Sequence, residues 1–184
     1  LDGVPVRREK MSKMRALIAE HMSRSVHVSP HVTTVFEIDM QNIVSFREKQ
    51  KAEFEKKHSF KITYTHFIVN AAVQAIKEHP IVYVSVDGED ILFKDEINIG
   101  VAVAIESGLI VPVVKNAGEM NFIEIAKAID DLVMRARTKK LLPTDVKGGT
   151  FSVTNPGLYG SITSNPIINQ PQVAILGVGQ IQKR

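Results

Sequence analysis

The chain has 184 residues, 44% of them hydrophobic and 23% charged, which is ordinary globular composition and enough for one domain. It has 23 lysines and arginines against 20 acidic residues, a modest excess, and no apolar run of about 20 residues, so we expect neither nucleic acid nor a membrane as a partner. Cysteine is absent, which excludes disulfides, thiolate metal ligands and a cysteine nucleophile.

The first forty residues predict an extended arm over 1–8, a helix over 10–25 and a strand over 31–40. The helix carries an apolar stripe at helical spacing, which we expect to pack in the core: Met11, Met14, Leu17, Ile18 and Met22. The strand alternates, with one face made by Thr34, Phe36, Ile38 and Met40.

The middle of the chain predicts three more helices. They cover 41–57, capped by Asp39, then 65–78, capped by Thr63 or Thr65 and stopped by Pro80, and finally 121–138, opened by an Asn121–Glu124 capping box. Between the last two, a hairpin is expected over 82–94, followed by two strands at 97–105 and 109–114 whose apolar runs indicate burial on both faces.

The stretch 148–179 begins with a predicted strand, 150–153, that ends in Thr154 and Asn155. Pro156-Gly157 breaks the strand, a polar loop follows, and a second strand is expected over 173–178. A hydroxyl and an amide at the mouth of a buried strand suit a polarised carbonyl or a thioester, although Asn-Pro-Gly is also strong turn chemistry on its own. Strands interleaved with helices indicate an α/β fold, a two-layer sandwich with a mixed sheet.

Several common catalytic motifs are missing from the sequence. It has no phosphate-binding glycine-rich loop, no G-x-S-x-G elbow and no H-E-x-x-H pair. His27 and His31 lack nearby acidic ligands, so we expect no metal site. His31 and His66 flank predicted elements and are interpreted as structural histidines.

Three segments carry a likeness to a known family: NIGVAVAIESGLIVPVVK at 98–115, GGTFSVTNPG at 148–157 and NPIINQPQVAILG at 165–177. With them the chain resembles, over essentially its whole length, the catalytic core domain of the dihydrolipoyl acyltransferases of 2-oxo acid dehydrogenase complexes. The resemblance implies a chloramphenicol-acetyltransferase-like fold, that of the coenzyme A-dependent acyltransferases.

The resemblance also implies a reaction and an assembly. An acyl group passes from a dihydrolipoyl-lysine arm, carried on a separate domain, to coenzyme A, and no metal takes part. Trimers with the active site between subunits build a cubic or dodecahedral core, whose implied partners are the 2-oxo acid decarboxylase/dehydrogenase and dihydrolipoyl dehydrogenase components.

The family's site residues fall on four positions of this chain. Thr154 resembles the hydroxyl that donates to the tetrahedral oxyanion, and Asn155 resembles part of the coenzyme pocket. Arg47 resembles the arginine that meets the phosphate-bearing end of the coenzyme, and Thr63 a neighbouring polar contact. Where many relatives have an aspartate, this sequence has Ala104, which can make no polar contact.

The family's general base is a histidine in an H-x-x-x-D-G motif, and none of the six histidines here has an aspartate four residues later. The resemblance places that motif beyond Arg184. We therefore expect 1–184 to be a single catalytic core domain truncated at its C-terminus, without a lipoyl or peripheral-subunit-binding domain and with little activity by itself.

Two alternatives stay open: a core paralogue that acts only as a scaffold, and a free trimeric antibiotic acetyltransferase of the same fold. For the acyl group, Leu158-Tyr159-Gly160-Ser161 and the N-P-I-I-N-Q-P-Q run resemble the branched-chain or succinyl branches more than the acetyl branch. The expected location is the bacterial cytoplasm, or the mitochondrial matrix in a eukaryote.

Overall fold

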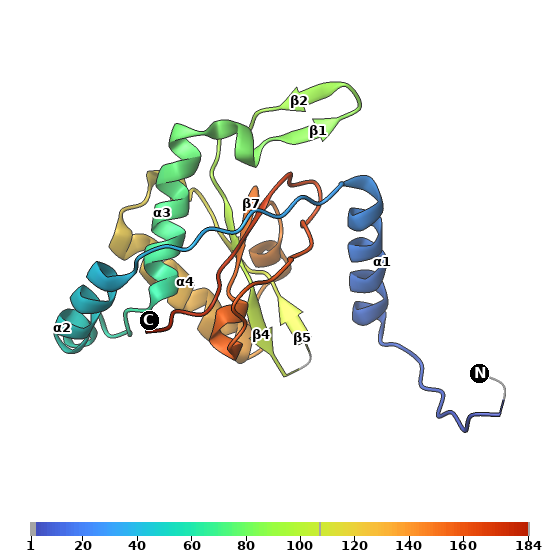
Figure 1. The fold of residues 1–184 in the computed structure, drawn as a ribbon, viewed down its shortest axis with the longest axis horizontal. Helices are drawn as coiled ribbons and strands as arrows, with labels where there is room; N and C mark the ends of the chain where they lie inside the picture. The colour runs from blue at the N-terminus through green and yellow to red at the C-terminus, as the bar shows by residue number, and fades with distance from the viewer. Residues whose placement is uncertain (1–2, 107, 184) are drawn as a thin grey trace.

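A four-stranded mixed sheet forms the centre of the protein in the computed structural model, which describes residues 3–106 and 108–183 (Figure 1). Its strand order is β6 (Val113–Val114), β3 (Ile99–Val101), β7 (Phe151–Thr154) and β8 (Ile175–Gly177). β3 runs antiparallel to β6 and parallel to β7, and β7 runs parallel to β8. The α/β fold with a mixed sheet, expected from the sequence, is confirmed.

Helices α3 (Tyr64–Glu78) and α4 (Phe122–Arg137) supply the second layer of the core. Side chains from both helices pack with alternate residues of β3 and β7 in one cluster: Val69, Val73, Ile76, Ile125, Ile129 and Leu132 with Ile99, Val101, Phe151 and Val153. Each fully buried aliphatic side chain of this kind stabilises the fold by about 1.5–3 kcal/mol. The core therefore lies on one face of the sheet, and the other face is left to different residues.

The predicted helix boundaries rest on local chemistry and are close to those observed. Asn121 caps α4 by accepting from the backbone N–H groups of Ile123 and Glu124, and Glu124 accepts from the Asn121 N–H in return. The Asp39 carboxylate accepts from the N–H of Gln41, the first residue of α2 (Gln41–His58). Within the described residues, no helix is long and apolar enough to cross a membrane.

Helix α1 (Lys13–Val28) forms as expected, but the prediction that its apolar stripe packs in the core is wrong. Met14 is 67% exposed and Leu17 63% exposed, because no element in the described part of the chain covers that side of the helix. Polar contacts attach α1 instead: the buried Ser25 hydroxyl donates to the Ile168 carbonyl at 2.6 Å, and Gln170 Nε2 donates to the Ser29 hydroxyl at 2.6 Å. Figure 1 shows α1 on the opposite side of the strands from α3 and α4.

The segment 31–40 was predicted as a strand and belongs to no sheet among the described residues. Phe36 is 80% exposed and Ile38 75% exposed, so the alternation is present without a partner strand or a covering layer. His31 at its start is structural, as expected: the Ile168 N–H donates to its Nε2 at 2.9 Å, while its Nδ1 lies 2.6 Å from the Ser29 carbonyl oxygen.

The two long strands predicted at 97–105 and 109–114 are each interrupted. β3 and β6 belong to the main sheet, while β4 (Val103–Ile105) and β5 (Gly108–Ile110) pair as a separate two-stranded sheet. Burial on both faces is confirmed for β3, whose three residues are all buried, but Leu109 in β5 is 55% exposed. The expected hairpin forms from β1 (Ser85–Asp87) and β2 (Asp90–Leu92), which project at the top of Figure 1.

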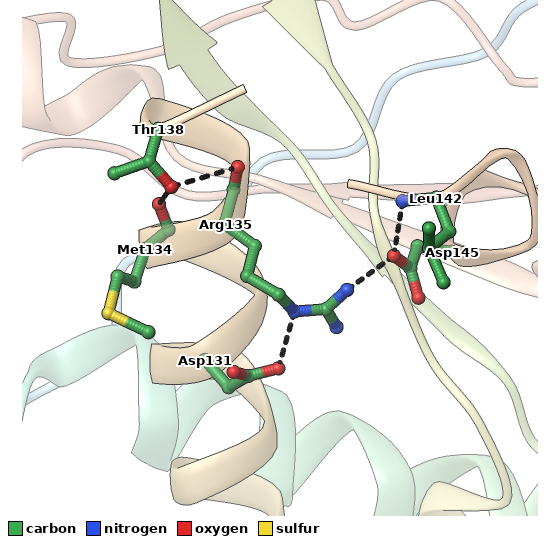
Figure 2. A network of polar contacts seen from close by, with 6 residues as sticks. All are labelled: Asp131, Met134, Arg135, Thr138, Leu142 and Asp145. Carbon is green, nitrogen blue, oxygen red and sulfur yellow. Dashed lines mark hydrogen bonds and ion pairs between the residues drawn. The ribbon is translucent and has the colours of Figure 1, made fainter. Parts of the chain in front are cut away.

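Short 3₁₀ turns join the larger elements in the described part of the chain: η1 (Pro80–Tyr83), η2 (Ala117–Glu119), η3 (Pro143–Val146) and η4 (Pro156–Tyr159). Figure 2 shows how η3 is held against α4: the guanidinium of Arg135 bridges Asp131, one turn earlier on the helix, and Asp145 in η3. The same Asp145 oxygen accepts from the Leu142 N–H at 2.7 Å. The connection that leads into β7 is thus fixed to the helix layer by a charged junction.

Candidate active site at the end of β7

Thr154 is the last residue of β7 and lies where the parallel strands β3, β7 and β8 end. Because strand residues alternate between faces and Phe151 and Val153 point into the core, Thr150, Ser152 and Thr154 point to the opposite face. Thr154 is half-buried, its carbonyl accepts from the Val178 N–H at 2.9 Å, and within the described residues its hydroxyl makes no hydrogen bond. A fixed backbone therefore presents a free hydroxyl.

The loop after Thr154 is clamped to the segment that follows β8. The Gly157 N–H donates to the Val178 carbonyl at 3.1 Å, and the Gln180 N–H donates to the Ser161 carbonyl at 2.9 Å. A side chain on Gly157 would place its Cβ 2.3 Å from the backbone carbonyl of Gly179, so only glycine permits this approach. The turn predicted at Asn155-Pro156-Gly157 is present, and its backbone forms a wall beside Thr154.

Asn155 connects the end of β7 to the start of α3. Its side-chain Nδ2 donates to the Thr65 hydroxyl at 3.3 Å, and Thr65 lies in the first turn of the helix. Thr63 is the N-cap residue, and its backbone N–H donates to Nδ1 of His66 at 3.3 Å. Thr63 and Asn155, two of the residues selected from the sequence, thus both lie at the N-terminus of α3.

Arg47 reaches the same place from α2. Its Nε donates to the Ile62 carbonyl at 3.0 Å, and its guanidinium lies 4.8 Å from the centre of the Tyr64 ring. The guanidinium also pairs with Glu48 at 2.8 Å. A guanidinium beside the first turn of a helix, where the helix dipole is positive, offers donors to phosphate or another anion in competition with Glu48.

The structure therefore brings three of the four selected residues together at the N-terminus of α3, and Thr154 adjoins them through Asn155. Sequence reasoning named Thr65 only as a possible helix cap and missed Tyr64 as the ring beneath Arg47. Tyr64 lies seventeen residues after Arg47, across a helix end and a loop, so no local sequence pattern indicates their contact. Ala104 is exposed on β4 and, as expected, offers no polar group.

His66 is the most strongly perturbed titratable group near this site. It is 2% exposed, and burial lowers its pKa to about 4, so its imidazole is neutral at pH 7. Its ring lies against Phe60, with the centroids 6.0 Å apart. With Nδ1 accepting from Thr63, His66 serves as a structural support of the helix start, as the sequence indicated.

The described ranges 3–106 and 108–183 contain no group of three or more histidine, aspartate or glutamate side chains that could hold a metal ion. The polar groups gathered at the site are hydroxyls, an amide, a guanidinium and backbone N–H groups. These are hydrogen-bond donors for an oxyanion and for phosphates rather than metal ligands.

Comparison with known proteins gives a consistent result. A family model described as 2-oxoacid dehydrogenases acyltransferase (catalytic domain) matches residues 4–184. The dihydrolipoyllysine-residue succinyltransferase component of the 2-oxoglutarate dehydrogenase complex of Rickettsia felis is 45% identical over 179 residues, which cover 97% of this chain and 45% of the relative. The chain thus spans about half the length of the curated relatives it matches.

Two solved structures share the fold closely. A probable dihydrolipoamide acetyltransferase from Listeria monocytogenes aligns with a TM-score of 0.94 and 39% identity, covering 97% of this chain and 76% of that one. The cubic core of a pyruvate dehydrogenase multienzyme complex aligns with a TM-score of 0.92 and 31% identity, covering 98% of this chain and 74% of that one.

Proposed function

Because the chain belongs to the family of 2-oxoacid dehydrogenase acyltransferase catalytic domains, we propose that it transfers an acyl group from a dihydrolipoyl group to coenzyme A. The single observation that carries this proposal is the unpaired hydroxyl of Thr154, held at the end of a buried parallel strand beside an electropositive helix N-terminus.

Each part of the site has a role in this chemistry. The coenzyme thiolate attacks the thioester carbonyl, and the Thr154 hydroxyl donates to the oxyanion that develops. Asn155, Thr63 and Arg47 bind the coenzyme, with the guanidinium of Arg47 facing its phosphates. Breakdown of the tetrahedral intermediate releases the dihydrolipoyl thiol. The base that takes the proton from the coenzyme thiol is a histidine outside residues 1–184.

We propose succinyl as the acyl group, with branched-chain acyl groups as the second choice. The similarity to the succinyltransferase component of Rickettsia felis, which is 45% identical to this chain, supports succinyl over acetyl as the acyl group. The segment 158–161 lies directly after the site, and its Leu158 and Tyr159 are 74% and 76% exposed. We expect this segment to contact the acyl group and to determine which acyl group is accepted.

For the assembly we propose a trimer that builds a larger core, cubic or dodecahedral, and binds the 2-oxo acid decarboxylase/dehydrogenase and dihydrolipoyl dehydrogenase components. Support comes from the similarity to a cubic core and from the exposed apolar side of α1, which is suited to burial between subunits.

The test is a transfer assay on the full-length protein, with coenzyme A and S-succinyl-, S-acetyl- or S-isobutyryl-dihydrolipoamide, following release of the acyl-coenzyme A. Transfer that is fastest with succinyl and is lost when Thr154 is changed supports the proposal. A full-length protein that assembles but transfers none of the three acyl groups would identify a scaffold and refute it.

A further inference from the structure

The region near the start of β7, at the opposite end of the strand from Thr154, is hollow. A cavity of about 460 Å³ opens between α1 and the face of the sheet that α3 and α4 leave uncovered. His21 of α1 and Lys94 border it on one side, while Gly100, Gly149 and Gln172 form its floor and wall. A volume of this size holds a small organic molecule.

Lys94 places a positive charge at the cavity, and no carboxylate pairs with it among the residues that the structure describes. Lys94 Nζ donates to the Tyr83 carbonyl at 3.0 Å and to the Ser85 hydroxyl at 2.6 Å, which engages two of its three N–H groups with neutral oxygens. No lining residue is an aspartate or glutamate. Burial lowers the pKa of the Lys94 ammonium, as expected for a desolvated cation that lacks a counter-charge.

A buried acceptor on the wall has no partner either. Gln172 is 2% exposed, and its Nε2 donates to the Gly149 carbonyl at 3.1 Å, while its Oε1 makes no hydrogen bond within the described residues. An unpaired buried polar atom of this kind costs about 1–3 kcal/mol, so a donor that reaches it, from a water molecule or a ligand, would recover that cost.

The two groups are joined by a short bonded path. The Ser85 hydroxyl that accepts from Lys94 donates to the Pro171 carbonyl at 2.7 Å, and Pro171 precedes Gln172. On the floor, a Cβ on Gly100 would lie 2.9 Å from a methyl of Val111 and 3.1 Å from the buried, unpaired hydroxyl of Ser152. A side chain at this position would therefore crowd both groups, whereas glycine leaves the space free.

We propose that this cavity is a binding site for a small carboxylate that also carries a hydroxyl or N–H donor, with the carboxylate on Lys94 and the donor on Gln172 Oε1. The site is separate from the transfer site at Thr154, and its ligand is bound rather than acylated.

The experiment is calorimetric titration of the full-length protein at physiological salt with each enantiomer of malate and with succinate, which differs from malate by one hydroxyl. We expect one enantiomer of malate to bind at least about fivefold more tightly than succinate, because only malate can donate to Gln172. Lys94→Met should weaken both ligands at least about tenfold, since it removes a charge-assisted hydrogen bond.

Lys115→Met is the matched control. This exposed lysine donates to the Lys147 carbonyl close to Gly148 but does not line the cavity, so its loss should leave both affinities unchanged. Gln172→Leu should abolish the preference for malate while retaining binding of succinate. Should that variant fail to fold, the Lys94→Met and Lys115→Met comparison still decides the question.

Three results would overturn the proposal. One is the absence of binding by either malate or succinate at millimolar concentrations. Another is equal weakening by Lys94→Met and Lys115→Met, which would indicate non-specific charge attraction. The third is a wild-type protein that binds neither carboxylate and whose sedimentation coefficient changes on Lys94→Met. That result would show that a neighbouring copy, rather than a small ligand, occupies the cavity.

Discussion

The side-chain amide of Asn155 donates to the hydroxyl of Thr65 at 3.3 Å and so joins the end of β7 to the first turn of α3 across 90 residues of sequence. This contact fixes the position of the N-terminus of α3 relative to the strand that carries Thr154. The Thr154 hydroxyl and the electropositive end of α3 therefore belong to one site.

Replacing Thr65 by valine tests this contact. Valine keeps the shape and removes the acceptor, so Asn155 loses its partner, and we expect the KM for coenzyme A to rise about three- to tenfold with kcat little changed. Thr65→Ser should restore the wild-type KM in the transfer assay. An unchanged KM in Thr65→Val would show that the contact does not orient the coenzyme pocket.

Replacing Thr154 by valine tests the oxyanion donor. Valine is nearly isosteric, so the fold should persist while kcat falls about 10²- to 10³-fold. Thr154→Ser retains the hydroxyl and should keep most of the activity. Thermal melts of all three proteins separate a catalytic loss from unfolding, and a Thr154→Val protein with wild-type kcat would remove Thr154 from the mechanism.

Replacing Gly157 by alanine tests the clamp beside the site. The new Cβ would lie 2.3 Å from the Gly179 backbone, which cannot withdraw, so we expect a loss of about 3 kcal/mol in the free energy of unfolding. Gly118→Ala is the control, because its nearest neighbour is the flexible tip of Ile97 at 3.3 Å. Urea unfolding of the two variants should separate them clearly, and equal stabilities would contradict the close approach.

The pH dependence of stability tests His66. Its pKa is about 4 in the folded protein against an ordinary value near 6.5, so the unfolded chain binds the proton more readily. Stability is therefore complete above about pH 6.5 and falls as the pH drops toward 4, by about 3 kcal/mol at most. His66→Asn, which keeps an acceptor for the Thr63 N–H, should flatten this slope in urea melts, and an unchanged slope would contradict the buried neutral imidazole.

The junction between α4 and η3 gives a second stability prediction. Asp145 accepts from the Leu142 N–H and from Arg135, and both contacts lower the pKa of its carboxyl. Its contribution is present above the ordinary carboxyl pKa and is lost as the pH falls through the lowered value. Asp145→Asn should cost about 1–2 kcal/mol at pH 7, whereas Asp131→Asn, at a half-exposed i,i+4 pair, should cost under about 0.5 kcal/mol.

The elements that could be predicted from the sequence are those whose signals are local. Asn121 and Glu124 are three residues apart and cap α4 directly, and Pro80 ends α3 because it cannot continue a helix. Even the strand of the site was placed within one residue, 150–153 against Phe151–Thr154. Such signals are independent of where the rest of the chain goes.

Burial of α1 and pairing of 31–40 could not be predicted in the same way. The periodicity of Met14 and Leu17 shows that one side of α1 is apolar, and the alternation of Phe36 and Ile38 shows a strand-like face. Neither pattern says which surface, if any, covers that face. The same holds for the site, where motif likeness selected Thr154 and Asn155, but the partner Thr65 depends on a contact between distant segments.

The attachment of α1 through Ser25, Ser29 and Gln170, with little apolar burial, has a thermodynamic consequence. Heat capacity and denaturant sensitivity both scale with the surface exposed on opening, so release of α1 from a single copy should change either very little. The helix can then leave the sheet in a separate step before the core melts, and hydrogen exchange of its amides should report that step independently of global unfolding.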